Sequence, residues 1–107
     1  MEFNKNILNI NSVEFNVIEI LEREIGLTNL NELKDEIDKE IGNGNKNIGI
    51  DLKNIQVINS SGLGILISCQ NKLKSVNGSL KLLNPSDKVF NIFKITKLNL
   101  VFDILNL

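Results

Sequence analysis

Apolar and polar residues alternate along several short stretches of the chain, and each such stretch predicts a β-strand. The alternation over residues 13–17 continues in shifted phase through Ile18 and Ile20, so we expect a strand with a bulge or a second phase. Residues 48–52 predict a strand in the middle of the sheet, and residues 80–83 predict another short strand. Residues 3–10 carry a weaker pattern, for which we expect an edge strand paired with the first.

Apolar residues spaced three and four apart define the buried face of a first helix: Leu27, Leu30, Leu33, Ile37 and Ile41. Thr28 or Asn29 can cap the start of this helix, and Glu32 stands at the capping-box distance from Asn29. The run Gly42-Asn43-Gly44 is expected to end it.

Two further helices are predicted. The second runs from Leu63 to about Val76 and ends at Asn77-Gly78. The third has Pro85 in its first turn and Asn84 as its cap. Its buried side is supplied by Val89, Phe90 and Phe93.

The last residues, Leu100, Phe102 and Ile104, alternate once more, as a short strand or as the start of a terminal segment. The order is then strand, strand, helix, strand, helix, strand, helix, strand. This order predicts an α/β fold: a mixed, mostly parallel sheet with right-handed crossovers, packed by about three to four helices. No linker or repeat interrupts the 107 residues, so we expect one domain over residues 1–107.

Composition and charge exclude several classes of function. The net charge is −1, from 12 basic and 13 acidic residues, and no basic stripe is visible, which argues against direct nucleic-acid binding. With no histidine and the single cysteine Cys69, the chain offers neither a disulfide framework nor a histidine-dependent triad, and a zinc site is not expected. No signal-like or membrane-spanning apolar run is present, so we expect no membrane insertion and a cytoplasmic location.

The segment Asn59-Ser60-Ser61-Gly62-Leu63-Gly64 joins the third predicted strand to the second helix. Free backbone N–H groups at a helix start favour negative charge. Ser60 or Ser61 can therefore cap the helix, a role worth about 1 kcal/mol. Alternatively, a serine here can be phosphorylated, which adds about −1.5 to −2 charges where the helix tolerates them. The residues alone leave both interpretations open.

Other chemistry has weaker support. Ile67 stands where a dinucleotide fingerprint has its third glycine, and no P-loop lysine is present. Acidic residues of the first helix alternate with Lys34 and Lys39, as on a solvated face. Asp51, at a strand end, is expected to hydrogen-bond loop amides. No catalytic set emerges, and the chain is not predicted to be an enzyme.

The first two turns of the second helix are apolar almost all round: Leu63, Ile65, Leu66, Ile67 and Cys69. One side must face the sheet. The rest is either an exposed binding surface beside the serines or a surface covered by other parts of the fold, and the pattern favours neither.

At this point the chain resembles the anti-sigma factor antagonists, the bacterial family that gives its name to the STAS domain. The resemblance runs over most of the chain and is strongest from Ile48 to about Leu83. A strand ending in Asp51-Leu52 leads through Val57 into the serine motif and a helix. Leu82-Leu83-Asn84-Pro85 then leads to Val89, Phe93 and a short closing strand.

In that family the motif is Asp-Ser-Ser-Gly-x-Gly, and an anti-sigma factor that is also an ATP-dependent kinase phosphorylates its second serine. The resemblance implies that Ser61 is the phosphoacceptor, and that a cofactor is not needed. It implies that the unmodified protein captures the anti-sigma factor serine kinase and frees the sigma factor, that phosphate abolishes capture, and that a PP2C-like phosphatase restores it. The implied contact residues are Asn59, Ser60, Ser61, Gly62, Leu63, Gly64 and Ile67.

The chain departs from the family in two places. Asn59 stands where the family has Asp, which removes a negative charge beside the acceptor serine but keeps the turn preference. The family also carries Gly-x-Leu/Ile-Asp between the second strand and the first helix, where this chain reads Arg23-Glu24-Ile25-Gly26. Two other functions stay open: a docking subunit of a scaffold or lipid-type ABC transporter that is not phosphorylated, and a small nucleotide-binding module.

Overall fold

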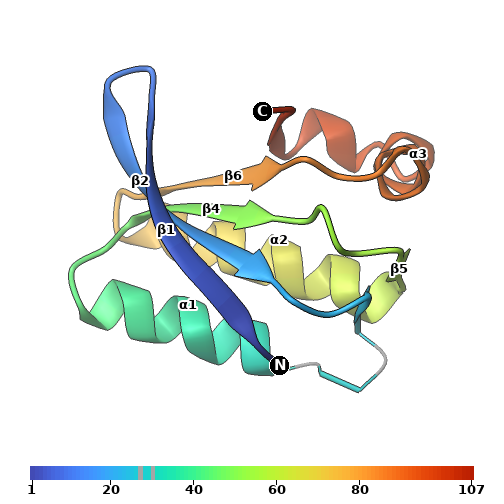
Figure 1. Ribbon diagram of the computed structural model, residues 1–107, viewed down its shortest axis with the longest axis horizontal. Helices are drawn as coiled ribbons and strands as arrows, with labels where there is room; N and C mark the ends of the chain where they lie inside the picture. The colour runs from blue at the N-terminus through green and yellow to red at the C-terminus, as the bar shows by residue number, and fades with distance from the viewer. Residues whose placement is uncertain (27, 30) are drawn as a thin grey trace.

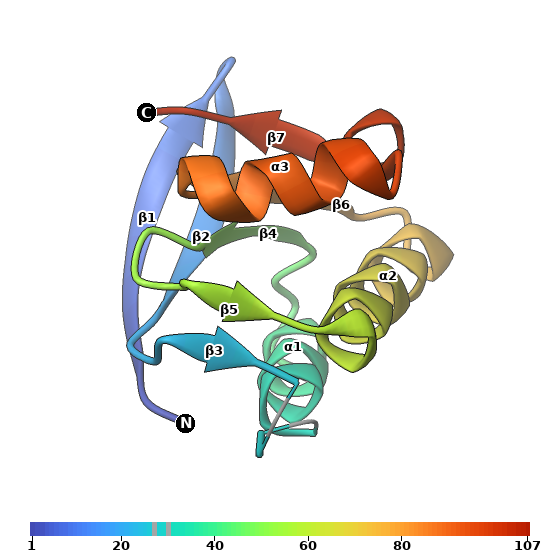
Figure 2. The ribbon, with the colours of Figure 1, turned by 90° about the vertical axis from the view of Figure 1, so that its right-hand side faces the viewer.

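Five strands form the main sheet of the computed structural model, which describes residues 1–26, 28, 29 and 31–107. Their order is β1-β2-β4-β6-β7 (Figures 1 and 2), where β1 and β2 are antiparallel and every other neighbouring pair is parallel. The strands are β1 (Phe3–Ile10), β2 (Val13–Ile20), β4 (Asn47–Asp51), β6 (Ser79–Leu83) and β7 (Asp103–Leu105). The predicted edge strand and the central position of residues 48–52 are both confirmed.

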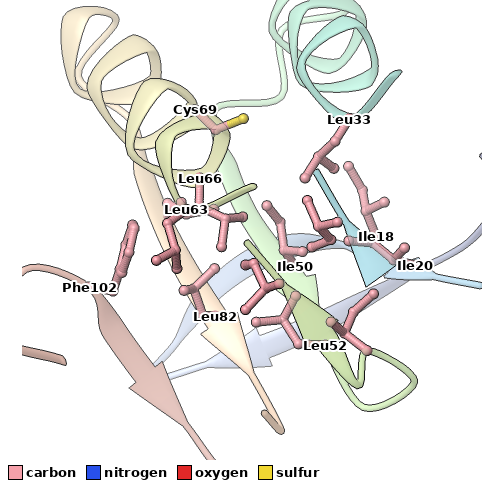
Figure 3. Close-up of a cluster of buried hydrophobic side chains, with 14 of the residues drawn as sticks. Ile18, Ile20, Leu33, Ile50, Leu52, Leu63, Leu66, Cys69, Leu82 and Phe102 are labelled. Carbon is pink, nitrogen blue, oxygen red and sulfur yellow. The ribbon is translucent and has the colours of Figure 1, made fainter. Parts of the chain in front are cut away.

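Three helices connect the parallel strands: α1 (Glu32–Gly42), α2 (Ser60–Ser75) and α3 (Asp87–Ile95), with a 3₁₀ turn at Leu98–Leu100 after α3. The α/β fold with a mixed, mostly parallel sheet is therefore confirmed. Helices α1 and α2 lie side by side on one face of the sheet (Figure 1). Apolar side chains of this face and of the two helices form the core, among them Ile18, Ile50, Leu82, Leu33 and Leu66 (Figure 3).

Of the two alternatives expected for β2, a bulge or a second phase, the bulge is wrong. β1 and β2 pair residue for residue, from Phe3 opposite Ile20 to Ile10 opposite Val13. The apparent change of phase arises because Val17, Ile18 and Ile20 are all buried. A strand covered on both faces is apolar without interruption, and such a run imitates a shift in alternation.

A second sheet, made of two strands of two residues each, was not predicted. Its parallel strands are β3 (Glu24–Ile25) and β5 (Val57–Ile58), and together with α3 it lies across the carboxyl end of β4 and β6 (Figure 2). Buried Ile25 and Ile58 fasten this ribbon to the core. Because α2 begins directly after β5, the ribbon fixes where that helix starts.

The start of α1 differs from the prediction. Asn31 is the N-cap and makes no side-chain cap bond, so neither Thr28 nor Asn29 caps the helix. Asn29 is buried, and its side chain serves the preceding loop: Oδ1 accepts from Gly26 N at 2.9 Å and Nδ2 donates to Glu24 O at 2.9 Å. Leu27 and Leu30, predicted on the buried face, lie outside the described residues. The predicted stop is confirmed, since α1 ends at Gly42 with Asn43 as its C-cap.

The start of α3 was also misplaced. Its cap is Ser86, whose Oγ accepts from Val89 N at 3.2 Å, and Pro85 precedes the cap. Asn84 has a left-handed backbone (φ 54°) in place of the extended one usual at a helix cap, and its Oδ1 accepts from Leu107 N at 2.7 Å. The buried side of α3 is as predicted for Val89 and Phe93, while Phe90 is half-buried. Leu100 is 79% exposed and lies outside the last strand, which holds Ile104.

Candidate functional site

Helix α2 begins at Ser60, three residues earlier than expected, and Asn59 caps it. The Asn59 Oδ1 atom accepts a hydrogen bond from Gly62 N at 2.8 Å, and its backbone carbonyl accepts from Leu63 N at 3.0 Å. Of the two interpretations of the serines, the one in which Ser60 or Ser61 caps the helix is therefore wrong. Asparagine is as good a cap as serine, and its longer side chain reaches Gly62 from outside the first turn.

Asn59 also ties the helix to the loop that follows β3. Its Nδ2 group donates to Gly26 O at 3.2 Å, across 33 residues of sequence. Gly26 has φ +107°, and a Cβ atom there would lie 2.0 Å from Asn59 Oδ1. Only glycine fits this position, and sequence analysis did not identify it as part of the site. The glycine in Arg23-Glu24-Ile25-Gly26 was the available signal.

The two glycines of the motif have different roles. Gly62 is buried, and a Cβ atom there would lie 2.3 Å from Ile25 O. It therefore lets α2 pack directly on β3. Gly64 is exposed, and an added Cβ would meet no heavy atom within 4 Å. Gly64 consequently leaves a smooth, open helix surface one turn after the serines.

Both serine side chains are available for chemistry. Ser60 and Ser61 are exposed, and within the described part of the chain neither hydroxyl has a hydrogen-bond partner. The first turn of α2 carries no acidic residue. Free backbone N–H groups and the positive end of the helix dipole therefore surround Ser61, which suits an added phosphate.

The remaining candidate residues divide by burial. Leu63 is only 8% exposed and belongs to the core, as do Leu66 and Cys69, while Ile67 is half-buried. Most of the apolar surface of α2 is thus covered, in line with the second of the two alternatives for this helix. Val57 in β5, just before the motif, is 42% exposed and adds an apolar side chain that sequence analysis did not single out.

Several acidic groups elsewhere in the chain have structural partners. Asp51 Oδ1 accepts from Lys53 N at 3.0 Å, which confirms its predicted role in binding a loop amide. Glu36 and Asp38 form ion pairs with Lys5 and Lys72, so the acidic side of α1 is more than a solvated face. No group of three or more potential ligands among the described residues could hold a metal ion.

Cys69 is buried and has no disulfide partner. Burial raises the pKa of its thiol to about 12, with a smaller contribution from the charge of Asp38. A thiol with such a high pKa is rarely ionised at neutral pH, so Cys69 is a core residue and no nucleophile. No helix of the described chain is long and apolar enough to cross a bilayer.

These observations define a class of protein: an α/β domain that presents two exposed serines at the start of a packed helix. A family model described as STAS domain matches residues 8–106. The chain therefore belongs to the STAS domain family, and the predicted resemblance is confirmed.

Among curated proteins, the chain is similar to the anti-sigma-B factor antagonist of Bacillus subtilis (strain 168), with 38% identity over 53 residues. This match covers 50% of the chain and 49% of the relative, so it spans about half the length of the curated protein.

Solved structures agree in fold. The anti-sigma factor antagonist SpoIIAA in its unphosphorylated form has a TM-score of 0.76 at 21% identity, covering 99% of this chain and 88% of that one. The phosphorylated form of SpoIIAA, a Bacillus cell fate determinant, has a TM-score of 0.69 at 21% identity, covering 99% and 91%. An anti-sigma factor antagonist from Mycobacterium paratuberculosis has a TM-score of 0.69 at 17% identity, covering 96% and 85%.

Proposed function

We propose that this chain is an anti-sigma factor antagonist whose binding is switched by phosphorylation of Ser61. The unmodified protein binds an anti-sigma factor that is also a serine kinase, in the cytoplasm, and this releases a sigma factor. Phosphate on Ser61 prevents binding until a PP2C-like phosphatase removes it. One observation carries the proposal: in a STAS domain, Ser61 is exposed in the first turn of a helix that another residue caps, and its hydroxyl has no hydrogen-bond partner among the described residues.

The contact surface follows from the burial of the motif. Ser60, Ser61 and Gly64 are exposed, and Asn59 and Ile67 are half-buried, so these five can touch a partner. Gly62 and Leu63 lie beneath them and hold α2 against β3 and the core. In this proposal Gly62 and Leu63 position the contact surface but do not touch the partner.

The switch acts through electrostatics at the contact. A phosphoserine at a helix start brings about −1.5 to −2 charges, which the helix end tolerates. Ser61 is exposed, whereas the buried residues of α2 include Leu63, Leu66, Cys69, Gln70 and Leu73, so a phosphate on Ser61 leaves this packing in place. Desolvating the same dianion in an interface opposes binding, and a penalty of about 3 kcal/mol lowers affinity more than a hundredfold.

The test is a titration of purified anti-sigma factor kinases from the source organism with the wild type, Ser61→Ala, Ser61→Asp and the phosphorylated protein. We expect the wild type and Ser61→Ala to bind with similar affinity. Ser61→Asp should bind at least about tenfold more weakly, and the phosphoprotein more weakly still, because it carries the larger charge. Asn71→Asp is the matched control, since Asn71 is exposed on the same helix far from the serines.

The result that contradicts the switch is equal binding by the unmodified and phosphorylated proteins. If Asn71→Asp lost as much affinity as Ser61→Asp, the effect would come from the net charge of the molecule, and this result would also contradict a switch at Ser61. A chain that binds no such kinase and receives no phosphate would instead fit a constitutive docking subunit.

A further inference from the structure

Strand β1 is an edge of the main sheet with few of the features that protect edges. Within the described residues, β2 is the only strand paired with β1, and the outer side of β1 is not covered by another element in either view (Figures 1 and 2). β1 is eight residues long, contains no proline and pairs with β2 without a bulge. Edge strands that avoid pairing are usually short, bulged or broken by proline or charge.

The hydrogen-bonding groups of β1 can be divided into inward and outward ones. Leu21 N donates to Glu2 O at 2.9 Å, one step before the pair Phe3 and Ile20. The opposite end of the hairpin is a two-residue turn in which Asn11 and Ser12 have φ 51° and 67°. The hydrogen bond at one end of the hairpin and the turn at the other both imply that the even-numbered residues of β1 form the backbone hydrogen bonds to β2. The odd-numbered residues Phe3, Lys5, Ile7 and Asn9 therefore direct their N–H and C=O groups outward.

Lys5, the charged residue of β1, does not protect this edge from pairing with another strand. Lys5 forms ion pairs with Glu36 and with Glu40, the latter at 3.0 Å, and both partners belong to α1. Its ammonium group is thus held over the face of the sheet. Ile7, the next outward residue, is 60% exposed and presents an apolar side chain beside the free backbone groups.

We propose that β1 pairs with β1 of a second copy of this chain, antiparallel about a twofold axis, and joins the two five-stranded sheets. Two residues directly opposite in an antiparallel pair either both hydrogen-bond across it or both do not, and their side chains lie on the same face. Residues of β1 whose backbone groups point outward must therefore lie opposite residues of the same kind in the second copy. The register with Ile7 opposite Ile7 sets Lys5 beside Asn9. A shift by two residues places Lys5 opposite Ile7 of the other copy. A shift by four places the two Lys5 residues opposite each other, where their like charges repel. The favoured register forms about six backbone hydrogen bonds.

Sedimentation equilibrium over a wide concentration range tests the pairing. We expect the wild type to be in a monomer–dimer equilibrium and Ile7→Lys to be monomeric at every concentration, because two lysines would then face each other. Ile95→Lys is the matched control: Ile95 is 76% exposed on α3, and this variant should dimerise like the wild type. A monomeric wild type, or a dimer that survives Ile7→Lys, would overturn the proposal. Circular dichroism confirms that both variants fold.

Hydrogen exchange read residue by residue locates the interface. Where nine in ten chains are paired, the outward N–H groups of Lys5, Ile7 and Asn9 should exchange about tenfold more slowly than in dilute protein. Those of the even-numbered residues, already bonded to β2, should change less. Dimers without this alternation would place the interface elsewhere and refute the proposal. The unphosphorylated protein suffices, so the outcome is independent of the role of Ser61.

Discussion

A single side-chain amide, that of Asn59, organises the start of helix α2. Its oxygen accepts from Gly62 N and its nitrogen donates to Gly26 O, so one residue caps the helix and fastens it to the loop after β3. An aspartate, which the resembling family has at this position, could make only the first bond, because a carboxylate has no proton to donate. Asn59 is therefore a structural bridge in this chain as well as a neighbour of Ser61.

Replacing Asn59 with Asp tests the bridge. The cap is retained and a charge at the helix start gains about 0.3–1 kcal/mol. Against this, the bond to Gly26 O is lost, and a carboxylate oxygen approaches that carbonyl, which together cost about 1–3 kcal/mol. We expect a net loss of about 1 kcal/mol at pH 7 in urea unfolding. Asn91→Asp, at an exposed position of α3, should change stability by less than about 0.5 kcal/mol. A gain of stability in Asn59→Asp would refute the bridge.

The position of the motif could be predicted from sequence, but its cap could not. Two serines and two glycines after a strand mark a helix start, and α2 does begin there. The choice of Asn59 over the serines depends on Gly26 and Ile25, which lie more than 30 residues earlier in the sequence. Local pattern contains no information on such a contact.

At the scale of elements, the β3–β5 ribbon and helix α2 form one packed unit, and Gly62 leaves no room for a Cβ atom between α2 and β3. The long elements β2, β4, β6 and α2 were predictable because their apolar patterns extend over at least five residues. The ribbon was not, since two-residue strands have no period and are defined only by each other. The caps of α1 and α3 were misplaced for a similar reason: Asn29 and Asn84 bond to loop and terminal backbone groups instead.

The two glycines of α2 offer a matched pair of substitutions. Gly62→Ala places a methyl group against Ile25 O and should cost about 1–3 kcal/mol of stability. Gly64→Ala has open space and should stabilise the protein by up to about 1 kcal/mol through helix propensity. Thermal unfolding of both variants measures the difference. Equal effects of the two substitutions would show that α2 does not pack on β3 at Gly62.

Helix α1 is joined to the hairpin by charge. Burial disfavours ionised Glu40, but the hydrogen bond from Asn45 Nδ2 (2.8 Å) and the ammonium of Lys5 outweigh it and hold the pKa of Glu40 below its usual value. The bonds to Glu36 and Glu40 raise the pKa of Lys5. The contribution of Glu40 is therefore complete above its unfolded pKa of about 4.3 and is lost as the pH falls through its lower folded value.

This link predicts a particular acid response. Between pH 6 and pH 3, Glu40→Gln should lose about 0.5–1 kcal/mol less stability than the wild type, because its contribution no longer titrates. Glu14→Gln, on the exposed hairpin, should lose as much as the wild type. Urea midpoints at both pH values measure the difference. An unchanged acid loss in Glu40→Gln would mean that the ion pair with Lys5 contributes nothing.

At the scale of the whole molecule, charge is divided between the two halves of the chain. Residues 1–51 hold 11 of the 13 acidic residues, whereas residues 52–107 hold seven basic and two acidic ones and are net +5. The candidate site lies in the second, basic half, and its helix turns a packed face to the core and its serines to solvent. A phosphate on Ser61 is thus expected to alter the surface without altering the core.

The most direct measurement is the intact mass of the protein after incubation with ATP and an extract of its own cells, followed by mapping of any phosphate. We expect one phosphate, located on Ser61, retained in Ser60→Ala and absent in Ser61→Ala. Both variants should unfold within about 0.5 kcal/mol of the wild type because Asn59 is the cap. An unmodified protein in an extract that phosphorylates a known antagonist, or phosphate on another residue, would contradict a switch at Ser61.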